Sequence, residues 1–590
     1  MNQGLPGLQH RRGIPVARPS PGPPKPIKLD GVGKLALETG RTRLLVAGLV
    51  FALAFLAIGL RLVELGLLRE GNEPRVARSE TAQPFNTGRA DIVDRNGVVL
   101  ATTLPTQSLY ANPRLVMDVE ETAAALAGVL PELSPGELAA KLSLERSFVW
   151  LKRNLTPRQQ YEVNRLGLPG LDFQRELDRV YPLGALAVQI VGFTDVDGNG
   201  LAGLEHAYDT RLRSEDQPLQ LSIDIRVQHI LAEELARTIS EFRAIGGVGL
   251  VLDADTGEIV ALVSLPTFDP DRPGTAPAEA RFNRATLGVY EMGSVFKIFT
   301  TAMALDEGIV DLNDGYDVRK PIKVARYVIR DYKPKNRWLS VPEIFIYSSN
   351  IGTVHMAMDA GTKTQQDFLS RLGLTRPAPI ELPEIGQPML PSPWREINTM
   401  TIAYGHGLAV SPLQVTRAVG AIVNGGILKP VTLMKATSQE PLYEQRVISE
   451  ETSRAMSWLM RLVVQYGTGR KANAPGYMVG GKTGTADKLV GRRYVDDARM
   501  ATFVGAFPMD DPRYVVLAMI DEPKGNDSTF GYATGGWVAA PLVGRVVERI
   551  GPLGSAIRPL RLLPRPAEEE AGVDELLIPA KAGRFVLAAQ

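Results

Sequence analysis

The chain has 590 residues, of which 44% are hydrophobic and 22% charged, and its formal net charge is +1. This length suggests several domains, and the balanced charge gives no reason to expect a nucleic-acid partner. Cysteine is absent, which excludes disulfides, thiolate metal ligands and a cysteine nucleophile. The five histidines are scattered without a pair at metal-ligand spacing, so no metal site is predicted.

The N-terminal region predicts a membrane anchor. Residues 1–43 are basic and rich in Pro and Gly, without a hydrophobic period, which is typical of a disordered tail. An uncharged run from Leu44 to Leu60 follows and continues amphipathically, so residues 44–68 are predicted to form a transmembrane helix. A buried soluble helix and a cleaved signal peptide are the weaker interpretations. The positive-inside rule leaves the tail in the cytoplasm and exports the rest.

Residues 69–219 have a mixed pattern and are interpreted as a separate domain, called the pedestal below. Two β-prone pieces flank Asn96-Gly97, which predicts a hairpin. Helical stretches interrupted by prolines follow between residues 119 and 165. Acidic and amide side chains alternate from Asp195 to Asn199, but the glutamate that would complete a calcium loop is missing. A turn is therefore the better interpretation there.

Residues 220–551 are predicted to form an α+β domain. A helix ending near Arg243 precedes a strand–turn–strand pattern over residues 246–264, and two further strands are expected at 501–507 and 514–520. The sequence between these pairs is mostly helical. One antiparallel sheet completed by both ends of the domain, flanked by helices and carrying a helical subdomain, fits this order. Residues 552–590 are predicted to be a poorly ordered tail.

A possible serine nucleophile lies in this domain. Ser294 follows Gly293 and precedes Lys297 by three places at the predicted start of a helix that stops near Gly308. Positions i and i+3 share one helix face, and a desolvated lysine amine can take a proton from a serine hydroxyl. The free N–H groups of a helix start favour an oxyanion. Alone, this spacing also occurs in many ordinary helices.

Two further motifs strengthen the hypothesis. Ser348-Ser-Asn350 precedes a helical stretch, and Lys482-Thr-Gly-Thr485 lies just before a break. In this order the three motifs match the catalytic set of penicillin-binding proteins and serine β-lactamases. Their intervals leave room for a helical subdomain and a return to the sheet.

Over residues 85–550 the chain resembles class B penicillin-binding proteins, and within them the division-specific FtsI type. The stretches that carry the resemblance, besides the three motifs, are Arg89–Gly97, Gly203–Glu205, Ser264–Pro270, Asn283–Ala285, Ala403–Gly407 and Gly535–Pro541. No stretch resembles the glycosyltransferase domain of class A enzymes. Met292 stands where proline is usual in the family.

The resemblance implies a serine-type peptidoglycan D,D-transpeptidase of the penicillin-binding fold. Ser294 would attack the penultimate D-Ala of a stem peptide, with Lys297 as the base. Ser348 would relay a proton, and Asn350 would hold Lys297 and the substrate amide. Neither a metal nor an organic cofactor is implied.

The third motif would bind the substrate. Lys482 and Thr483 would orient its backbone and terminal carboxylate, and Thr485 would also contact that carboxylate. Gly484 would let the substrate lie against the strand as an added one. The backbone N–H groups of Ser294 and Thr485 would form the oxyanion hole.

The resemblance also implies partners and a place in the cell. Expected ligands are peptidoglycan stem peptides on lipid II-derived strands and β-lactams. An FtsW-type glycosyltransferase and other divisome proteins are expected partners, at the septum, with the catalytic domain in the periplasm and the anchor in the inner membrane. An elongation-type transpeptidase, a D,D-carboxypeptidase or β-lactamase, and a β-lactam sensor remain alternatives. An anchor and a long pedestal count against hydrolysis of a soluble drug, and residues 1–43 are a poor signalling domain.

Overall fold

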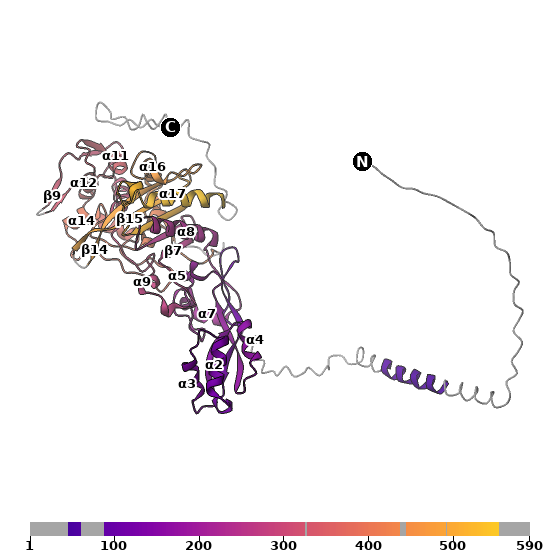
Figure 1. The fold of residues 1–590 in the computed structure, drawn as a ribbon. Helices are drawn as coiled ribbons and strands as arrows, with labels where there is room; N and C mark the ends of the chain where they lie inside the picture. The colour runs from indigo at the N-terminus through magenta and orange to yellow at the C-terminus, as the bar shows by residue number, and fades with distance from the viewer. Residues whose placement is uncertain (1–44, 61–87, 325–326, 437–443, 491–492, 554–590) are drawn as a thin grey trace, which may run out of the picture. The chain divides into compact units, whose positions relative to one another are not determined.

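A computed structural model describes most of the chain (Figure 1). Residues 45–60 form a helix, and within the described ranges no helix has the length and apolar character needed to cross a membrane. The predicted span at 44–68 lies only partly inside these ranges, the tail 1–43 lies outside them, and so does nearly all of 552–590. The described ranges are 45–60, 88–324, 327–436, 444–490 and 493–553.

The pedestal is built on a mixed sheet whose order is β3-β2-β1-β5, with β4 paired to β2. β1 and β2 are antiparallel and join around Gly97, whose φ of 85° suits a tight turn, so the predicted hairpin is confirmed. β1 also pairs in parallel with β5. The strands are β1 (Ile92–Val93), β2 (Val99–Ala111), β3 (Val149–Leu155), β4 (Leu171–Val180) and β5 (Leu219–Gln220).

Three helices cover one face of this sheet. Leu109 and Leu151 of the strands pack with Leu126 and Leu138 of the helices in one buried cluster. Two of these helices begin with proline after a capping side chain, as at Ser134. The helices are α2 (Val119–Val129), α3 (Pro135–Leu142) and α4 (Pro157–Arg165).

The acidic loop of the pedestal is a turn. Asp195 Oδ1 accepts hydrogen bonds from the backbone N–H groups of Asp197 and Asn199, at 2.9 and 2.8 Å, and Thr194 bridges Gly200. The carboxylate thus closes its own loop, which confirms the turn interpretation. The loop connects α5 (Val188–Val191) to the short helices α6 (Gly203–Ala207) and α7 (Asp209–Ser214).

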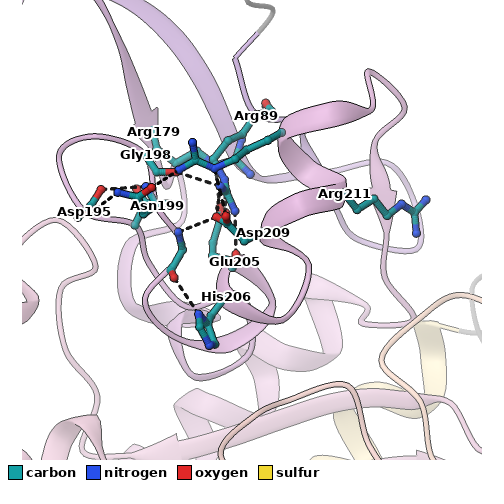
Figure 2. Close-up of polar contacts among 12 residues, drawn as sticks. Arg89, Arg179, Asp195, Gly198, Asn199, Glu205, His206, Asp209 and Arg211 are labelled. Carbon is teal, nitrogen blue, oxygen red and sulfur yellow. Dashed lines mark hydrogen bonds and ion pairs between the residues drawn. The ribbon is translucent and has the colours of Figure 1, made fainter.

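A buried ion network ties the start of the pedestal to these helices (Figure 2). Glu205 is fully buried and accepts from Arg89 Nε and Arg179 Nε, each at 2.7 Å. Arg89 also reaches the Gly198 carbonyl at 2.9 Å and the Asp209 carboxylate at 2.5 Å. Both guanidinium groups are nearly inaccessible, so this network connects segments more than 100 residues apart without water.

The second sheet is antiparallel throughout, in the order β14-β15-β16-β6-β7. Along β16 the side chains alternate, with Leu517 in one buried cluster and Ala518 in another. This sheet confirms the predicted α+β arrangement, because strands from both ends of the domain complete it. The strands are β6 (Gly246–Asp253), β7 (Ile259–Leu265), β14 (Gly480–Val490), β15 (Arg493–Phe507) and β16 (Tyr514–Asp521).

Helices cover both faces of this sheet. α8 and α17 pack together against one face, in the cluster that contains Ala518, as Figure 1 shows. α15 and α16 pack on the other face, in the cluster that contains Leu517. These helices are α8 (Ile225–Glu241), α15 (Pro412–Val423), α16 (Glu450–Gln465) and α17 (Ala539–Ile550).

The region between the strand pairs is mostly helical, as predicted, but it also contains short strands that the sequence did not reveal. Each has only two or three residues, too few to display an alternating pattern. The helices are α9 (Ala278–Arg281), α10 (Lys297–Asp306), α11 (Val341–Tyr347), α12 (Asn350–Ala360), α13 (Thr362–Arg371) and α14 (Glu396–Ile402), and the strands are β8 (Gly315–Asp317), β9 (Ile322–Val324), β10 (Tyr327–Ile329), β11 (Trp338–Ser340), β12 (Ile427–Leu428) and β13 (Gln445–Arg446).

The pedestal network generates a stability prediction. Replacing Glu205 by glutamine leaves two buried guanidinium groups without their shared counter-charge, so we expect Glu205→Gln to lower the free energy of unfolding by about 3–5 kcal/mol. The matched control is Glu215→Gln, because Glu215 pairs with Arg211 at an exposed site, and we expect a change below about 1 kcal/mol there. Urea unfolding followed by circular dichroism measures both. Equal effects of the two changes would contradict this view of the network.

Candidate active site

The candidate nucleophile lies in a tight turn between the sheet and the helical region. Ser294 belongs to a 3₁₀ turn, Gly293–Phe296, that runs directly into α10. The sequence predicted an α-helical start here; the structure shows that the α-helix itself begins at Lys297. Gly293 has a φ of 54°, and a Cβ placed on it would lie 2.4 Å from the Thr485 carbonyl oxygen. Glycine is therefore required where the turn meets β14.

Lys297 is fully buried beneath this turn. Its Nζ donates to the Ser348 carbonyl at 2.6 Å, to Ser348 Oγ at 3.1 Å and to Asn350 Oδ1 at 2.7 Å. Burial lowers the pKa of Lys297 well below its usual value, the nearby charge of Lys482 lowers it further, and Asp331 opposes both. A neutral amine can act as a base, so the structure supports the chemistry predicted for this residue.

Ser348 occupies an unusual backbone conformation at the end of α11. Its φ of 60° and ψ of 45° are left-handed, which few non-glycine residues adopt. Its Oγ accepts hydrogen bonds from Lys297 Nζ, at 3.1 Å, and from Lys482 Nζ, at 2.9 Å. The first and third motifs are thus joined through the second.

A neutral Lys297 would reverse the direction of one of these hydrogen bonds. A neutral amine has two N–H donors and one lone pair, and two of its partners, the Ser348 carbonyl and Asn350 Oδ1, can only accept. The hydroxyl of Ser348, which accepts from the charged amine, would then donate to that lone pair. Ser348 Oγ would accept from Lys482 while donating to Lys297, an arrangement suited to the proton relay predicted for it.

Lys482 and its neighbours lie on β14, the edge strand of the sheet. Lys482 is fully buried, and desolvation lowers its pKa to about 7. Thr483 Oγ1 is 2.7 Å from Thr468 Oγ1, and Thr485 Oγ1 accepts from the Gly535 N–H at 3.1 Å. The edge position leaves β14 able to pair with an added strand.

The structure shows a different reason for glycine at Gly484 from the one expected. A Cβ at this position would lie 2.4 Å from the Met292 carbonyl oxygen and 2.9 Å from Val295 Cγ2. The glycine therefore allows the nucleophile's turn to pack on the strand, whereas the sequence analysis attributed it to space for the substrate.

Sequence reasoning missed one buried carboxylate. Asp331 accepts from Ser349 Oγ at 2.8 Å and from the Ile351 N–H at 3.0 Å, and so holds the start of α12. It also raises the pKa of Lys297 against the lowering by burial. It lies in an irregular segment with no recognisable motif, so no local signal could have identified it.

The comparisons with known proteins agree with this arrangement. Residues 247–548 match the model of the penicillin binding protein transpeptidase domain, and residues 84–232 match that of the penicillin-binding protein dimerisation domain. A probable peptidoglycan D,D-transpeptidase FtsI of Caulobacter vibrioides is 42% identical over 83% of this chain and 86% of its own length. A probable peptidoglycan D,D-transpeptidase PenA of Neisseria meningitidis is 36% identical over 87% and 93%.

Solved structures of penicillin-binding proteins are also similar to this chain. Penicillin binding protein 3 from Mycobacterium tuberculosis, complexed with aztreonam, superposes with a TM-score of 0.64 at 26% identity, covering 81% of this chain and 97% of the other. The transpeptidase domain of penicillin-binding protein 3 from Burkholderia pseudomallei superposes with a TM-score of 0.52 at 34% identity, covering 58% and 98%.

The close approach at Gly484 can be tested by adding one methyl group. Because the new Cβ would meet backbone rather than a flexible side chain, we expect Gly484→Ala to lower the free energy of unfolding by about 1–3 kcal/mol. Gly128→Ala is the control: this glycine lies in α2 with no atom within 4 Å of the added Cβ, and we expect it to be neutral or stabilising by up to about 1 kcal/mol. Urea unfolding measures both, and a neutral Gly484→Ala would refute the packing argument.

Proposed function

Because the chain belongs to the penicillin-binding protein transpeptidase family, we propose that it is a peptidoglycan D,D-transpeptidase that cross-links stem peptides during septal cell-wall synthesis. The observation that carries the proposal is the contact of two buried lysines, Lys297 and Lys482, with the hydroxyl of Ser348. The names of the FtsI and PenA relatives support the reaction, and the FtsI name supports the septal role.

The proposed acylation uses these residues in turn. Ser294 Oγ attacks the carbonyl carbon of the penultimate D-Ala while Lys297 Nζ takes its proton. Ser348 passes a proton to the departing amine and is reprotonated by Lys297, which so returns to its neutral form. The C–N bond breaks, and free D-Ala leaves an ester on Ser294. The backbone N–H groups of Ser294 and Thr485 hold the oxyanion, an element worth about 3 kcal/mol per donor.

The second half of the reaction transfers the acyl group to an amine. The amine of a neighbouring stem peptide attacks the ester, gives up a proton and forms the cross-link, and Ser294 regains its hydroxyl. Lys482, Thr483 and Thr485 orient the donor along β14, with Asn350 on the opposite side. β-Lactams would acylate the same serine, which the aztreonam complex of the Mycobacterium tuberculosis relative supports.

The proposal includes an anchor and partners. Residues 44–68 span the inner membrane once, residues 1–43 remain in the cytoplasm, and a pedestal at 69–219 carries a periplasmic transpeptidase domain at 220–551. The uncharged run after a basic tail supports this topology. An FtsW-type glycosyltransferase would supply the glycan strands, and other divisome proteins would place the enzyme at the septum.

Donor and acceptor peptides test the reaction. We expect the full-length protein, given a pentapeptide donor and an amine acceptor, to release D-Ala and form a cross-linked product, and Ser294→Ala to do neither and to lose labelling by fluorescent penicillin. Mass spectrometry separates the products. Tetrapeptide and D-Ala without any cross-linked dimer would favour a carboxypeptidase, and labelling that survives Ser294→Ala would overturn the nucleophile.

The two lysines predict an acylation rate that is bell-shaped in pH. Burial lowers the pKa of Lys297 well below its usual value, and acidification would protonate the amine and remove the base. Raising the pH through about 7 neutralises Lys482 and weakens its attraction for the substrate carboxylate. Stopped-flow acylation by a β-lactam measures the profile, and the methyl ester of the same compound should lose the alkaline limb. A rate that rises steadily to high pH would contradict these roles.

A further inference from the structure

A cavity of about 690 Å³ lies along the outer side of α16, and none of its lining residues belongs to the candidate active site. Glu450, Arg454, Trp458, Arg461 and Gln465 line it at intervals of three or four residues, which is one face of the helix. The opposite face of α16 is buried in the domain core. This volume falls within the range of pockets for small ligands.

The cavity carries both signs of charge. Its cations are Arg446, Arg454 and Arg461, and apart from Glu450 its anions are Asp255, Asp510 and Asp511. Asp255 lies in the turn between β6 and β7, and Asp510 and Asp511 lie in the turn between β15 and β16. These three carboxylates are therefore outside α16. Burial and the neighbouring carboxylates of Asp253 and Asp511 raise the pKa of Asp255, while the charges of Arg513 and Lys429 oppose this shift.

The remaining lining suits a peptide. Trp458, Met478 and Met509 offer apolar and polarisable contact, and methionine adapts to varied shapes. The hydroxyl groups of Ser453 and Ser457 add hydrogen-bonding capacity to the lining, whereas the side-chain amide of Asn424 is already bonded to Ala254 and Ile427. A ligand with an ammonium, a carboxylate and amide bonds matches this combination better than a simple anion or cation does.

The cavity wall is in contact with the strand that carries Lys482. A Cβ added to Gly480 would lie 2.7 Å from Met509 Cγ and 2.9 Å from the Arg461 backbone nitrogen. Arg461 Nη1 also donates to the Val479 carbonyl at 2.8 Å. A change in the position of α16 would therefore move the start of β14.

The C-terminal end of α16 reaches the other motifs. Just beyond it, Thr468 Oγ1 lies 2.7 Å from Thr483 Oγ1. A Cβ on Gly467 would lie 2.7 Å from the carbonyl oxygen of Ile346, in the helix that ends at Ser348. The helix that lines the cavity thus abuts the carriers of two catalytic motifs.

We propose that this cavity is a regulatory site for a short zwitterionic peptide, whose binding changes the rate of acylation at Ser294 through α16 and β14. The choice of a cell-wall stem peptide as the matching ligand rests on the proposed function. The site itself rests on the cavity, the charged groups of both signs that line it and its contacts with β14.

The dipeptide L-alanyl-γ-D-glutamate is a suitable probe, because it carries an ammonium and two carboxylates but no D-Ala-D-Ala end. Full-length protein in detergent is first acylated with a β-lactam, which blocks Ser294. We expect saturable binding, seen by calorimetry and as a change in Trp458 fluorescence that Trp458→Phe removes. No acyl transfer is read, so failure here is distinct from failure of the transpeptidase assay.

Charge variants locate the site. We expect Arg446→Glu and Arg454→Glu each to weaken binding about tenfold, and the N-acetylated probe to bind about tenfold more weakly than the free dipeptide. Arg158→Glu is the control, because Arg158 is an exposed residue of the pedestal. This variant should bind the dipeptide as tightly as the unchanged protein. If the dipeptide does not bind to the acylated protein, or if all variants bind it equally, the proposed binding site is wrong.

The rate of penicillin acylation tests the coupling. With unmodified protein, a saturating concentration of the dipeptide should change the rate constant about twofold or more, and Arg446→Glu should shift this effect to higher dipeptide concentration. A rate constant that does not respond to bound dipeptide would overturn the regulatory role.

Discussion

The active site depends on placing two buried lysines against one serine hydroxyl. Lys297 and Lys482 both lie within about 3 Å of Ser348 Oγ, and neither is accessible to water. Two ammonium groups this close would repel each other by roughly 3 kcal/mol at an effective dielectric constant near 20, before any desolvation cost. Desolvation and this repulsion together lower the pKa of Lys297, which favours the neutral amine that the proposed mechanism needs as a base.

Keeping the lysines in place requires backbone to pack closely against backbone. The nucleophile's turn lies against β14 at Gly293 and Gly484, and against another loop at Gly405, where an added Cβ would lie 1.9 Å from the Gly293 carbonyl oxygen. The N–H of Gly293 donates to the Gly405 carbonyl at 3.1 Å. Side chains at these positions would separate the serine from the strand, so the short contacts fix the distance between the first and third motifs.

Sequence patterns revealed the parts of this arrangement whose causes are local. The hairpin at Gly97, the strands β6, β7 and β16, and the α+β order follow from turn residues and periodicity, and the three motifs follow from a resemblance. The left-handed conformation of Ser348 could not be predicted, because serine has no preference for it and tertiary contacts impose it. Asp331 and the Arg89–Glu205–Arg179 network were missed for a related reason: their partners are distant in the sequence, and a lone charged residue carries no sign of burial.

The three motifs lie on three separate elements. The distances between their side chains therefore depend on how these elements pack together. Lys297 begins α10, Ser348 ends α11 and Lys482 lies on β14. α16 packs against all three of these elements. Its inner side chains, such as Met456 and Leu459, are buried in the core, while its outer face lines a cavity instead of more protein. A core packed to ordinary density resists displacement from the inside, whereas a cavity on the outside leaves room for movement. Under the proposed regulation, a ligand in that cavity would restrict the movement of α16 and would act through it on the distance between the two lysines.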